Sequence, residues 1–400
     1  MTGSKNKKIV LLGATGSIGR QTLAVCRRLR YRLVAMSCGS NIDLAYRQIE
    51  EFKPRLVAVS DPQAGQKLEA KLKSNSALKE IKVLVSGQGI VDLVRLDYDL
   101  LVMAISGFAA MNPMLEAIKL GKTVAMANKE VVVGAGEFIL PLAEARGAKI
   151  YPVDSEPSAI WQAIRGEEVN PIQKVILTAS GGPFREWSPE DFSKIKPADA
   201  LKHPVWSMGN KITVDSASMM NKGLEMIEIC RLFKLKADQV EVLVHPQGIL
   251  HSAVEFRDGA VIGQMGLPDM ELPIQYALTY PQREAMPDKP ALDLSKISGL
   301  TFSQPDYHKF PALGLAYRAM EAGGALPAVL NAANELAVEA FLAEKIKFTD
   351  MAVIVENSLD QYSQEHFDLP KGVDDILAAD DWARGFARDQ VKAIIENSIN

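Results

Sequence analysis

Residues 8–29 read KIVLLGATGSIGRQTLAVCRRL, and this stretch decides the fold of the first part of the chain. Lys8–Leu12 is an apolar run of strand length, and a helical pattern extends from Arg20 to Leu29. The glycine-rich turn Gly13–Gly19 lies between them. Such glycines let the backbone approach a pyrophosphate, at which the helix N-terminus points its amides. The spacing is GxxGxxG rather than GxGxxG, so the strand–turn–helix context carries the prediction of a dinucleotide site.

Apolar runs and helical segments alternate through residues 1–150, which is typical of a doubly wound α/β domain. The further strands that we expect there are Arg32–Met36, Arg55–Ser60, Ile81–Ser86, Leu100–Ile105, Thr123–Met126 and Lys149–Val153. Ligands of such sheets bind at the carboxyl ends of the strands. Asn128, Lys129 and Glu130 follow one of these ends, where Asn128 could bond a nicotinamide ribose and Lys129 a substrate. The alternative is a polar helix start in which Glu130 favours the helix dipole.

The end of the second strand bears on the choice of cofactor. It reads SCGSN, so Ser37, Gly39, Ser40 and Asn41 offer donors and no carboxylate. An acid at this point binds the ribose hydroxyls of NAD and would repel a 2′-phosphate. The sequence therefore favours NADP, although an ordinary polar loop would look the same.

Length and composition narrow the class of protein. A chain of 400 residues, 48% apolar and 24% charged, is expected to fold as two or three globular domains. A net charge of -4 argues against bulk nucleic-acid or anionic-membrane partners. No apolar run reaches the length of a membrane span, and the N-terminal residues lack the pattern of a signal peptide. Three widely spaced cysteines indicate reduced thiols, so we expect a cytoplasmic protein.

Residues 151–160 read YPVDSEPSAI and place Asp154 and Glu156 on either side of Ser155. In an extended strand these two carboxylates would share a face, and a cation between them would relieve their repulsion. Oxygen ligands of this kind suit a hard divalent ion such as magnesium or manganese. The alternative is a turn before a helix, with Ser155 or Glu156 near the N-cap.

Residues 202–229 are dense in groups that bind phosphate. A strand at Lys174–Thr178 leads into this region through Ser180, Gly181 and Gly182. The donors that we expect to hold a phosphate are Ser180, His203, Ser216, Asn221 and Lys222. On a helix Glu225 shares a face with Asn221 and Lys222 and could supply a third metal carboxylate. Glu228 continues that face, so spacing alone does not decide between the two acids.

The segment 180–210 carries few core periodicities, and a long loop of this kind is often a lid over an active site. Trp206 could cover the substrate or could be a core tryptophan. We interpret His245 and His251 as hydrogen-bonded structural histidines in or beside strands. Prolines mark a linker at residues 291–312, and residues 313–400 show the periodicity of a helical bundle with a packing role.

Seven motifs occur together and in order: GATGSIG, ANKE, VDSEPSAI, SGGPF, HPVWSMG, VDSASMMNKGLE and LNAANE. In this order and spacing the chain resembles the 1-deoxy-D-xylulose 5-phosphate reductoisomerases over nearly its whole length. The resemblance implies a homodimeric oxidoreductase of the non-mevalonate isoprenoid pathway. Such an enzyme uses NADPH and one divalent cation (magnesium, manganese or cobalt) to convert a phosphorylated sugar to 2-C-methyl-D-erythritol 4-phosphate. The implied domains are 1–150 for NADPH, 151–290 for catalysis with lid 180–210, linker 291–312 and helical domain 313–400.

The resemblance also assigns residues, matched motif by motif. Asp154, Glu156 and Glu225 look like the metal ligands, which favours Glu225 over Glu228. The implied substrate contacts are Lys129, Ser155, Glu156, Ser180, His203, Trp206, Ser216, Asn221, Lys222 and Glu225, of which Lys129 and the three acids are catalytic. The implied cofactor contacts are Thr15, Gly16, Ser17, Ile18, Gly39, Ser40, Asn41, Asn128, Glu130 and Gly209.

Three positions depart from the pattern of the family. Val205 stands where the lid often carries a polar or basic residue, and Ser40 stands where a base often meets the 2′-phosphate. Glu271 stands where arginine is common, and the sequence offers no physical reason for it. A homoserine-type dehydrogenase or a non-enzymatic NADP sensor would also need the glycine turn. Neither would need the three acids, so metal dependence separates them from the reductoisomerase prediction.

Overall fold

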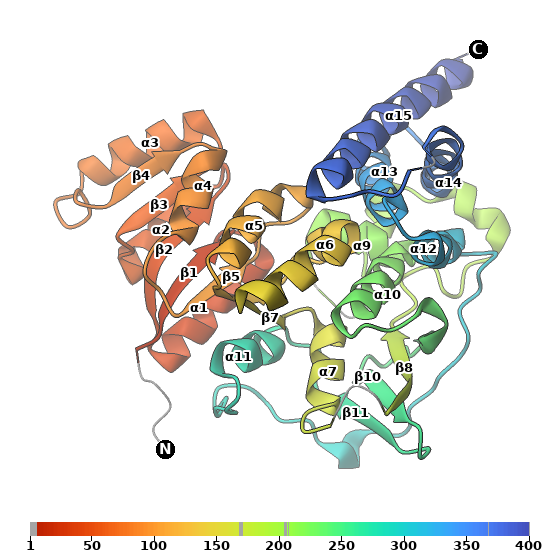
Figure 1. Ribbon diagram of the computed structural model, residues 1–400, viewed down its shortest axis with the longest axis horizontal. Helices are drawn as coiled ribbons and strands as arrows, with labels where there is room; N and C mark the ends of the chain where they lie inside the picture. Colours follow the sequence, from red (N-terminus) through yellow and green to blue (C-terminus); the bar gives the residue numbers. More distant parts are fainter. Residues whose placement is uncertain (1–5, 168–170, 204–205, 207, 367, 400) are drawn as a thin grey trace. The chain divides into compact units, whose positions relative to one another are not determined.

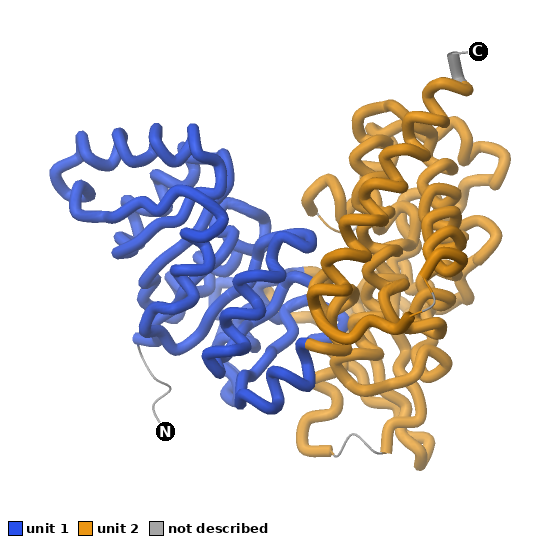
Figure 2. The backbone as a smooth tube through the Cα atoms, turned by 45° about the horizontal axis from the view of Figure 1, so that its top comes forward, with its two compact units in different colours: residues 1–128, 139–158, 269–289 blue, residues 129–138, 159–268, 290–400 orange. Residues whose placement is uncertain are grey.

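The computed structural model describes residues 6–167, 171–203, 206, 208–366 and 368–399. The chain forms two compact units, drawn in blue and orange in Figure 2. Unit 1 contains residues 1–128, 139–158 and 269–289, and unit 2 contains residues 129–138, 159–268 and 290–400. Neither unit is continuous in sequence, whereas the predicted domains are. Helices α6 (Glu130–Arg146) and α7 (Ser155–Ala163) each belong partly to both units.

Unit 1 is built on a parallel seven-stranded sheet with the strand order β4-β3-β2-β1-β5-β6-β7. The strands are β1 (Lys8–Leu12), β2 (Arg32–Cys38), β3 (Leu56–Val59), β4 (Lys82–Val85), β5 (Leu100–Met103), β6 (Thr123–Met126) and β7 (Lys149–Pro152). The order reverses at β1, which pairs with β2 on one side and β5 on the other. A crevice for a ligand is therefore expected at the carboxyl end of β1.

The strands of this sheet form where the sequence predicts them, because both faces are covered and the strands read as continuous apolar runs. Their ends differ from the prediction by at most two residues. The connecting helices are α1 (Ser17–Leu29), α2 (Ile42–Phe52), α3 (Pro62–Lys73), α4 (Gly87–Val94) and α5 (Met111–Lys119), with a 3₁₀ turn, η1, at Phe108–Ala110. Figure 1 shows them in red and orange around the sheet.

Helix α11 (Glu271–Thr279) lies far along the chain but packs into unit 1. Its residues Ile274, Ala277 and Leu278 are buried in the same core as Leu23 and Cys26 of α1. The side chain of Glu271 is also held there, since it accepts a hydrogen bond from Arg28 of α1 and pairs with Lys289 at 2.9 Å. The sequence placed this helix with the catalytic domain, because long-range packing leaves no local signal.

Unit 2 contains a four-stranded mixed sheet with the order β11-β10-β8-β9. Its strands are β8 (Ile172–Ala179), β9 (Val240–Val244), β10 (Leu250–Phe256) and β11 (Val261–Met265). Strands β8 and β9 are parallel, and β10 runs antiparallel to β8 and β11. His245 is buried at the end of β9, where its Nδ1 lies 3.0 Å from the carbonyl oxygen of Thr301. It is a structural histidine, as predicted.

The helices of unit 2 surround this sheet or form the C-terminal bundle. They are α8 (Pro197–Ala200), α9 (Asn210–Ala217), α10 (Met220–Leu232), α12 (Pro311–Ala322), α13 (Leu326–Leu342), α14 (Phe348–Glu365) and α15 (Val373–Ile399). The described part of the unit also contains the 3₁₀ turns η2 (Pro189–Lys194), η3 (Ala237–Gln239) and η4 (Leu294–Lys296). The α/β class, with a central mixed sheet and C-terminal helices, is confirmed.

Two further sequence observations have structural counterparts. Cys26, Cys38 and Cys230 are free and buried, as expected for thiols that fill the core. Within the described ranges, no helix is both long enough and apolar enough to cross a membrane.

Candidate active site

The turn between β1 and α1 is closely packed at two of its glycines. Gly13 has a φ of +90°, and a Cβ built there would lie 2.4 Å from the carbonyl oxygen of Ala104. A Cβ on Gly19 would lie 2.2 Å from the carbonyl oxygen of Gly13. Gly16 is the N-cap of α1, and a Cβ added there would meet no atom closer than 3.4 Å. The first and third glycines therefore shape the turn, and Gly16 leaves the helix N-terminus open, with Thr15, Ser17 and Ile18 beside it.

A pocket of about 730 Å³ lies in unit 1 beside this turn. Its lining includes Gly13, Gly16, Ser37, Gly39, Ser60 and Ser106, which lie at or after the carboxyl ends of β1, β2, β3 and β5. Ser37 accepts a hydrogen bond from the amide of Gly13 at 3.0 Å, and Asn41 caps α2 by accepting from the amide of Leu44. Ser40 beside it is exposed. The size, glycine lining and helix N-terminus suit a dinucleotide.

Several pocket residues were not predicted, although a simple rule would have found them. Ser60, Gln88, Ser106 and Asn112 are polar groups in or after the loops that follow β3, β4 and β5. The predicted cofactor contacts follow the first, second and sixth strands. Asn128 lies at the end of β6 as predicted, and its amide nitrogen donates to the carbonyl oxygens of Ile105 and Gly107, each at 2.8 Å.

The acidic segment adopts the alternative conformation that the sequence left open. Asp154 is not part of a strand but precedes α7, and its carbonyl oxygen accepts a hydrogen bond from the amide of Ser158 at 3.0 Å. Its Oδ1 accepts from the amide of Ser155 at 3.0 Å, and the hydroxyl of Ser155 donates to Oε2 of Glu156 at 2.6 Å. The expectation of an extended strand is therefore wrong. A carboxylate at the start of a helix is stabilised by the free amides there.

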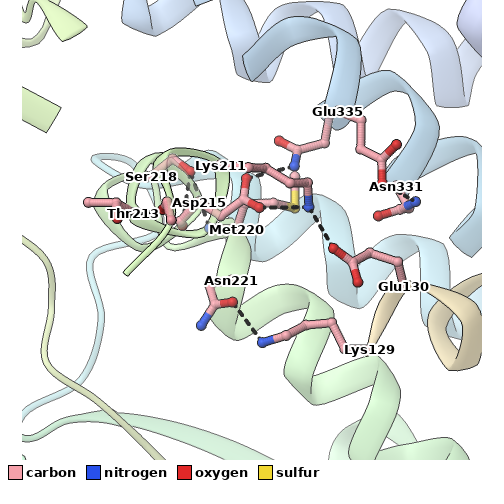
Figure 3. Close-up of polar contacts among 12 residues, drawn as sticks. Lys129, Glu130, Lys211, Thr213, Asp215, Ser218, Met220, Asn221, Asn331 and Glu335 are labelled. Atoms are coloured by element: carbon pink, nitrogen blue, oxygen red, sulfur yellow. Dashed lines mark hydrogen bonds and ion pairs between the residues drawn. The ribbon is translucent and has the colours of Figure 1, made fainter. Parts of the chain in front are cut away.

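Helix α10 presents its polar face as the sequence predicts. Glu225 is 1% exposed, and Lys222 Nζ lies 2.6 Å from its Oε2. Asn221 donates to its Oε1. Lys129, at the N-terminus of α6, reaches the same group: its Nζ lies 2.9 Å from Oε1 of Glu225 and 2.8 Å from Oδ1 of Asn221. Figure 3 shows Lys129 and Asn221 turned toward each other. Sequence spacing could not reveal this contact.

The charges of this cluster are balanced at Glu225. Burial raises the pKa of its carboxyl group, but Lys129 and Lys222 outweigh burial and hold the pKa below its ordinary value. The carboxylate is therefore ionised and neutralises part of the charge of two buried lysines. Glu228, the other candidate acid, is equally buried one turn further along α10.

Ser180, His203 and Ser216 come together as expected for a phosphate site. His203 Nε2 lies 3.2 Å from the Ser180 hydroxyl and 3.0 Å from that of Ser216, and its Nδ1 accepts from the amide of Trp206 at 2.8 Å. Since Nδ1 is an acceptor, the proton of the neutral ring is on Nε2. Burial and the nearby Lys222 lower the pKa of His203 to about 4. Gly182 packs against Ser216, whose carbonyl oxygen would lie 2.9 Å from an added Cβ.

The remaining predicted residues lie in the same unit or outside the described part of the chain. Trp206 is half-buried, with its ring centroid 6.2 Å from that of His251. Gly209 is the N-cap of α9, and the carboxylate of Glu130 lies 3.2 Å from Lys211 on that helix. Val205 lies outside the described residues. Lys211, Asp215 and Asn334, which form ion pairs and hydrogen bonds nearby, were not predicted.

Comparison with known proteins supplies the family. The model of 1-deoxy-D-xylulose 5-phosphate reductoisomerase matches residues 9–136, and models of two C-terminal domains of that enzyme match residues 150–233 and 265–386. The reductoisomerase of Geotalea uraniireducens is 48% identical over 382 residues, which cover 94% of this chain and 97% of the relative. This chain belongs to the 1-deoxy-D-xylulose 5-phosphate reductoisomerase family.

Two solved reductoisomerase structures agree with this membership. The enzyme from Zymomonas mobilis in complex with NADPH is 38% identical, with a TM-score of 0.88 over 96% of this chain and 99% of that one. A reductoisomerase in complex with NADPH, fosmidomycin and magnesium is 40% identical, with a TM-score of 0.90 over 96% of this chain and 98% of that one. The reductoisomerase fold therefore extends over nearly the full chain.

Proposed function

We propose that this chain carries out the reductoisomerase reaction with the residues assigned below. The reaction follows from membership of the family: the chain converts 1-deoxy-D-xylulose 5-phosphate to 2-C-methyl-D-erythritol 4-phosphate, with NADPH and magnesium, in the non-mevalonate isoprenoid pathway. The observation that supports the assignment most strongly is the buried, ionised Glu225 with Lys129, Asn221 and Lys222 around it. We further propose that residues 1–150, 151–290 and 313–400 act as nucleotide, catalytic and supporting domains, with 291–312 as a linker.

The divalent cation is assigned to Asp154, Glu156 and Glu225, each of which offers one carboxylate oxygen. Three carboxylates form an all-oxygen set that suits magnesium or manganese, and cobalt is a further candidate. When bound, the cation acts as a Lewis acid on the carbonyl and hydroxyl oxygens of the substrate.

The phosphate of the substrate is assigned to Ser180, Ser216, Asn221 and Lys222, with His203 beside them. Hydroxyl and amide groups donate hydrogen bonds, and Lys222 supplies the positive charge. Binding a phosphate at this end fixes the position of the reacting carbon atoms at the other end. The Nε2–H group of the neutral His203 ring now faces the hydroxyls of Ser180 and Ser216. It can instead donate a hydrogen bond to a phosphate oxygen.

Lys129 is assigned to stabilise or protonate a substrate oxygen. Ser155 and Glu156 are assigned as further substrate contacts. The ammonium group of Lys129 is held by two side-chain oxygens on α10, so its position is fixed before substrate binds. We propose that it stabilises or protonates negative charge on a substrate oxygen during the rearrangement. Trp206 and His203, on the predicted lid 180–210, would exclude water from the rearranging substrate.

NADPH is assigned to the pocket of unit 1 and supplies the hydride when bound. The amides of Thr15, Gly16, Ser17 and Ile18 would meet the pyrophosphate at the N-terminus of α1. Gly39, Ser40 and Asn41 would lie at the 2′-phosphate, where the chain offers a hydroxyl, an amide and backbone groups rather than a base. Asn128, Glu130 and Gly209 complete the assignment at the nicotinamide end.

The metal assignment is tested by titrating the protein with manganese and following binding by calorimetry. Glu225→Gln keeps the shape and the acceptor oxygen for Lys129 but removes the charge, so we expect it to lose manganese binding and turnover while remaining folded. Glu228→Gln is the matched control on the same helix and should bind manganese like the wild type. Retained binding in the Glu225 variant, or loss only in the Glu228 variant, would reverse the assignment.

We also propose that the protein is a homodimer joined through β11. This strand forms an edge of the unit 2 sheet, and Val261 and Ile262 on it are 55% and 44% exposed. An exposed apolar edge strand is a template for a second strand, and a second copy of β11 would cover it. Light scattering should give twice the chain mass for the wild type and a smaller mass for Ile262→Lys. An unchanged mass in that variant would place the interface elsewhere.

The cytoplasm remains the predicted location. Three buried free thiols are compatible with a reducing compartment.

A further inference from the structure

A chain of polar contacts in unit 2 connects four helices and, apart from Glu130, involves none of the residues assigned above to substrate, cofactor or metal. Lys211 of α9 lies 3.2 Å from Oε1 of Glu130 on α6 and 2.9 Å from Oδ2 of Asp215 on its own helix. Asn334 of α13 donates to Oδ1 of Asp215 at 2.7 Å. Figure 3 shows Lys211 between Glu130 and Asp215, with α13 beside them.

Asp215 is the central member of this chain. It is 1% exposed, and its two oxygens are held by groups on two different helices. Burial of a carboxylate is tolerated only when both charge and hydrogen bonding are satisfied. Helix α9 has only eight residues and begins at Gly209 with no side-chain cap, so these contacts fix its rotation and its position along its own axis.

The contacts also continue into the C-terminal bundle. Glu335, next to Asn334, has Oε2 2.6 Å from Arg384 of α15, and Arg384 has Nε 2.6 Å from Asp380 on the same helix. Asn331 donates to the other oxygen of Glu335 at 3.3 Å. Asn334 and Glu335 of the motif LNAANE, residues 330–335, thus connect α13 to α9 and to α15.

The ends of this chain adjoin two groups of the assigned site. Asp215 precedes Ser216, whose hydroxyl lies 3.0 Å from His203. Glu130 follows Lys129, whose ammonium is bound to Glu225 and Asn221. A shift of α9 would therefore move Ser216, which is proposed to donate a hydrogen bond to the phosphate. Through the ion pair of Lys211 with Glu130, it would also displace the segment that carries Lys129.

We propose that Asp215 and Asn334 are positioning residues of the reaction, which hold α9 so that Ser216 meets the substrate phosphate. This inference rests on the proposed function of Ser216 as a phosphate contact. Neither residue is assigned to substrate, cofactor or metal, so an effect of changing Asn334 on substrate affinity would be indirect, and the bond to Asp215 connects Asn334 to α9. The C-terminal bundle then contributes to substrate binding and not only to packing.

An exchange of the two side chains tests the contact. Asn334→Asp places a second carboxylate against Asp215, and the two like charges should push α9 away. Adding Asp215→Asn restores a donor–acceptor pair with its direction reversed: the amide at position 215 donates to the carboxylate at position 334 while its oxygen still faces Lys211. Asn334→Leu is a second variant, which removes the hydrogen bond without adding charge. Asp360→Asn, in an exposed ion pair with Arg318 on other helices, is the control.

Three properties are measured for each variant: the KM and kcat for 1-deoxy-D-xylulose 5-phosphate, the unfolding midpoint, and amide hydrogen exchange in residues 210–217. We expect Asn334→Asp to raise the KM about tenfold or more, since small displacements of binding groups have large effects. Exchange in α9 should become faster, and Asn334→Leu should show the same effects to a smaller degree. The double variant should return the KM to within about threefold of the wild type, because the two changes are coupled.

Two results would overturn the inference. One is a wild-type KM and wild-type exchange in α9 in folded Asn334→Asp and Asn334→Leu proteins. The other is a double variant that recovers its unfolding midpoint but not its KM, since the KM would then depend on something other than the contact between positions 215 and 334. A wild-type protein without turnover would instead refute the proposed function, and the exchange measurement would still decide whether the contact holds α9.

Discussion

Two glycines in one turn have different roles at the scale of single residues. At Gly13 a side chain would strike the backbone of Ala104, and the positive φ adds strain, so we expect Gly13→Ala to lower the free energy of unfolding by more than about 2 kcal/mol. At Gly16 the atom nearest to an added Cβ would lie 3.4 Å away, so Gly16→Ala should fold normally and bind NADPH more weakly. Urea unfolding and a fluorescence titration with NADPH distinguish the two effects. Equal stability of the two variants would contradict this account.

A buried histidine predicts the dependence of stability on pH. Burial lowers the pKa of His251 to about 4 from an ordinary value of 6.5. The unfolded chain therefore binds a proton in the window between these values that the folded chain does not bind. The stabilisation is fully present above pH 6.5 and is lost as the pH falls toward 4, by up to about 1.4 kcal/mol per pH unit for one proton.

His251→Gln should flatten this loss between pH 6.5 and 4, whereas His308→Gln, at an exposed position, should leave it unchanged. The measurement is the free energy of unfolding in urea across that range. A slope that does not differ between the wild type and the His251 variant would show that His251 does not titrate as described.

The sequence singled out residues whose contacts it could not predict. The motif around residue 154 pointed to Asp154 and Glu156, two of three acids that could hold a metal ion, although the local conformation is a helix start rather than a strand. Lys129 and Glu225 are 96 residues apart in sequence, so their ion pair depends on the fold of unit 2 and not on any local pattern.

At the scale of elements, periodicity predicted the strands and the C-terminal helices well, because each buries a continuous apolar run or stripe. It could not predict where α11 packs. That docking explains the unusual Glu271, which the sequence left without a reason: it pairs with Arg28 of α1 and with Lys289, and the side chains of Arg28 and Glu271 are each 11% exposed.

Arg28→Met should therefore destabilise unit 1, because it leaves Glu271 largely buried with the ion pair to Lys289 remaining. We expect the free energy of unfolding to fall by about 2 kcal/mol or more. Arg27→Met removes an exposed pair with Glu51 and should have a much smaller effect. If the two substitutions destabilise equally in urea, the docking of α11 does not depend on this ion pair.

At the scale of the whole molecule, composition and motifs predicted the class and the family, since they are properties of the whole chain. The division into two units was harder to predict from the sequence. Residues 129–138 belong to unit 2 and residues 269–289 to unit 1, so the chain crosses between the units several times. Crossings of this kind follow from packing in three dimensions and have no marker in composition.

The most direct test of the central claim is NADPH oxidation with 1-deoxy-D-xylulose 5-phosphate, measured by nicotinamide absorbance with and without EDTA. We predict turnover that stops with EDTA and returns when magnesium or manganese is added in excess. This result would establish the reaction, the cofactor and the metal requirement together. Turnover that is indifferent to chelation would contradict the carboxylate metal site, and no oxidation by folded protein that binds NADPH would contradict the reaction itself.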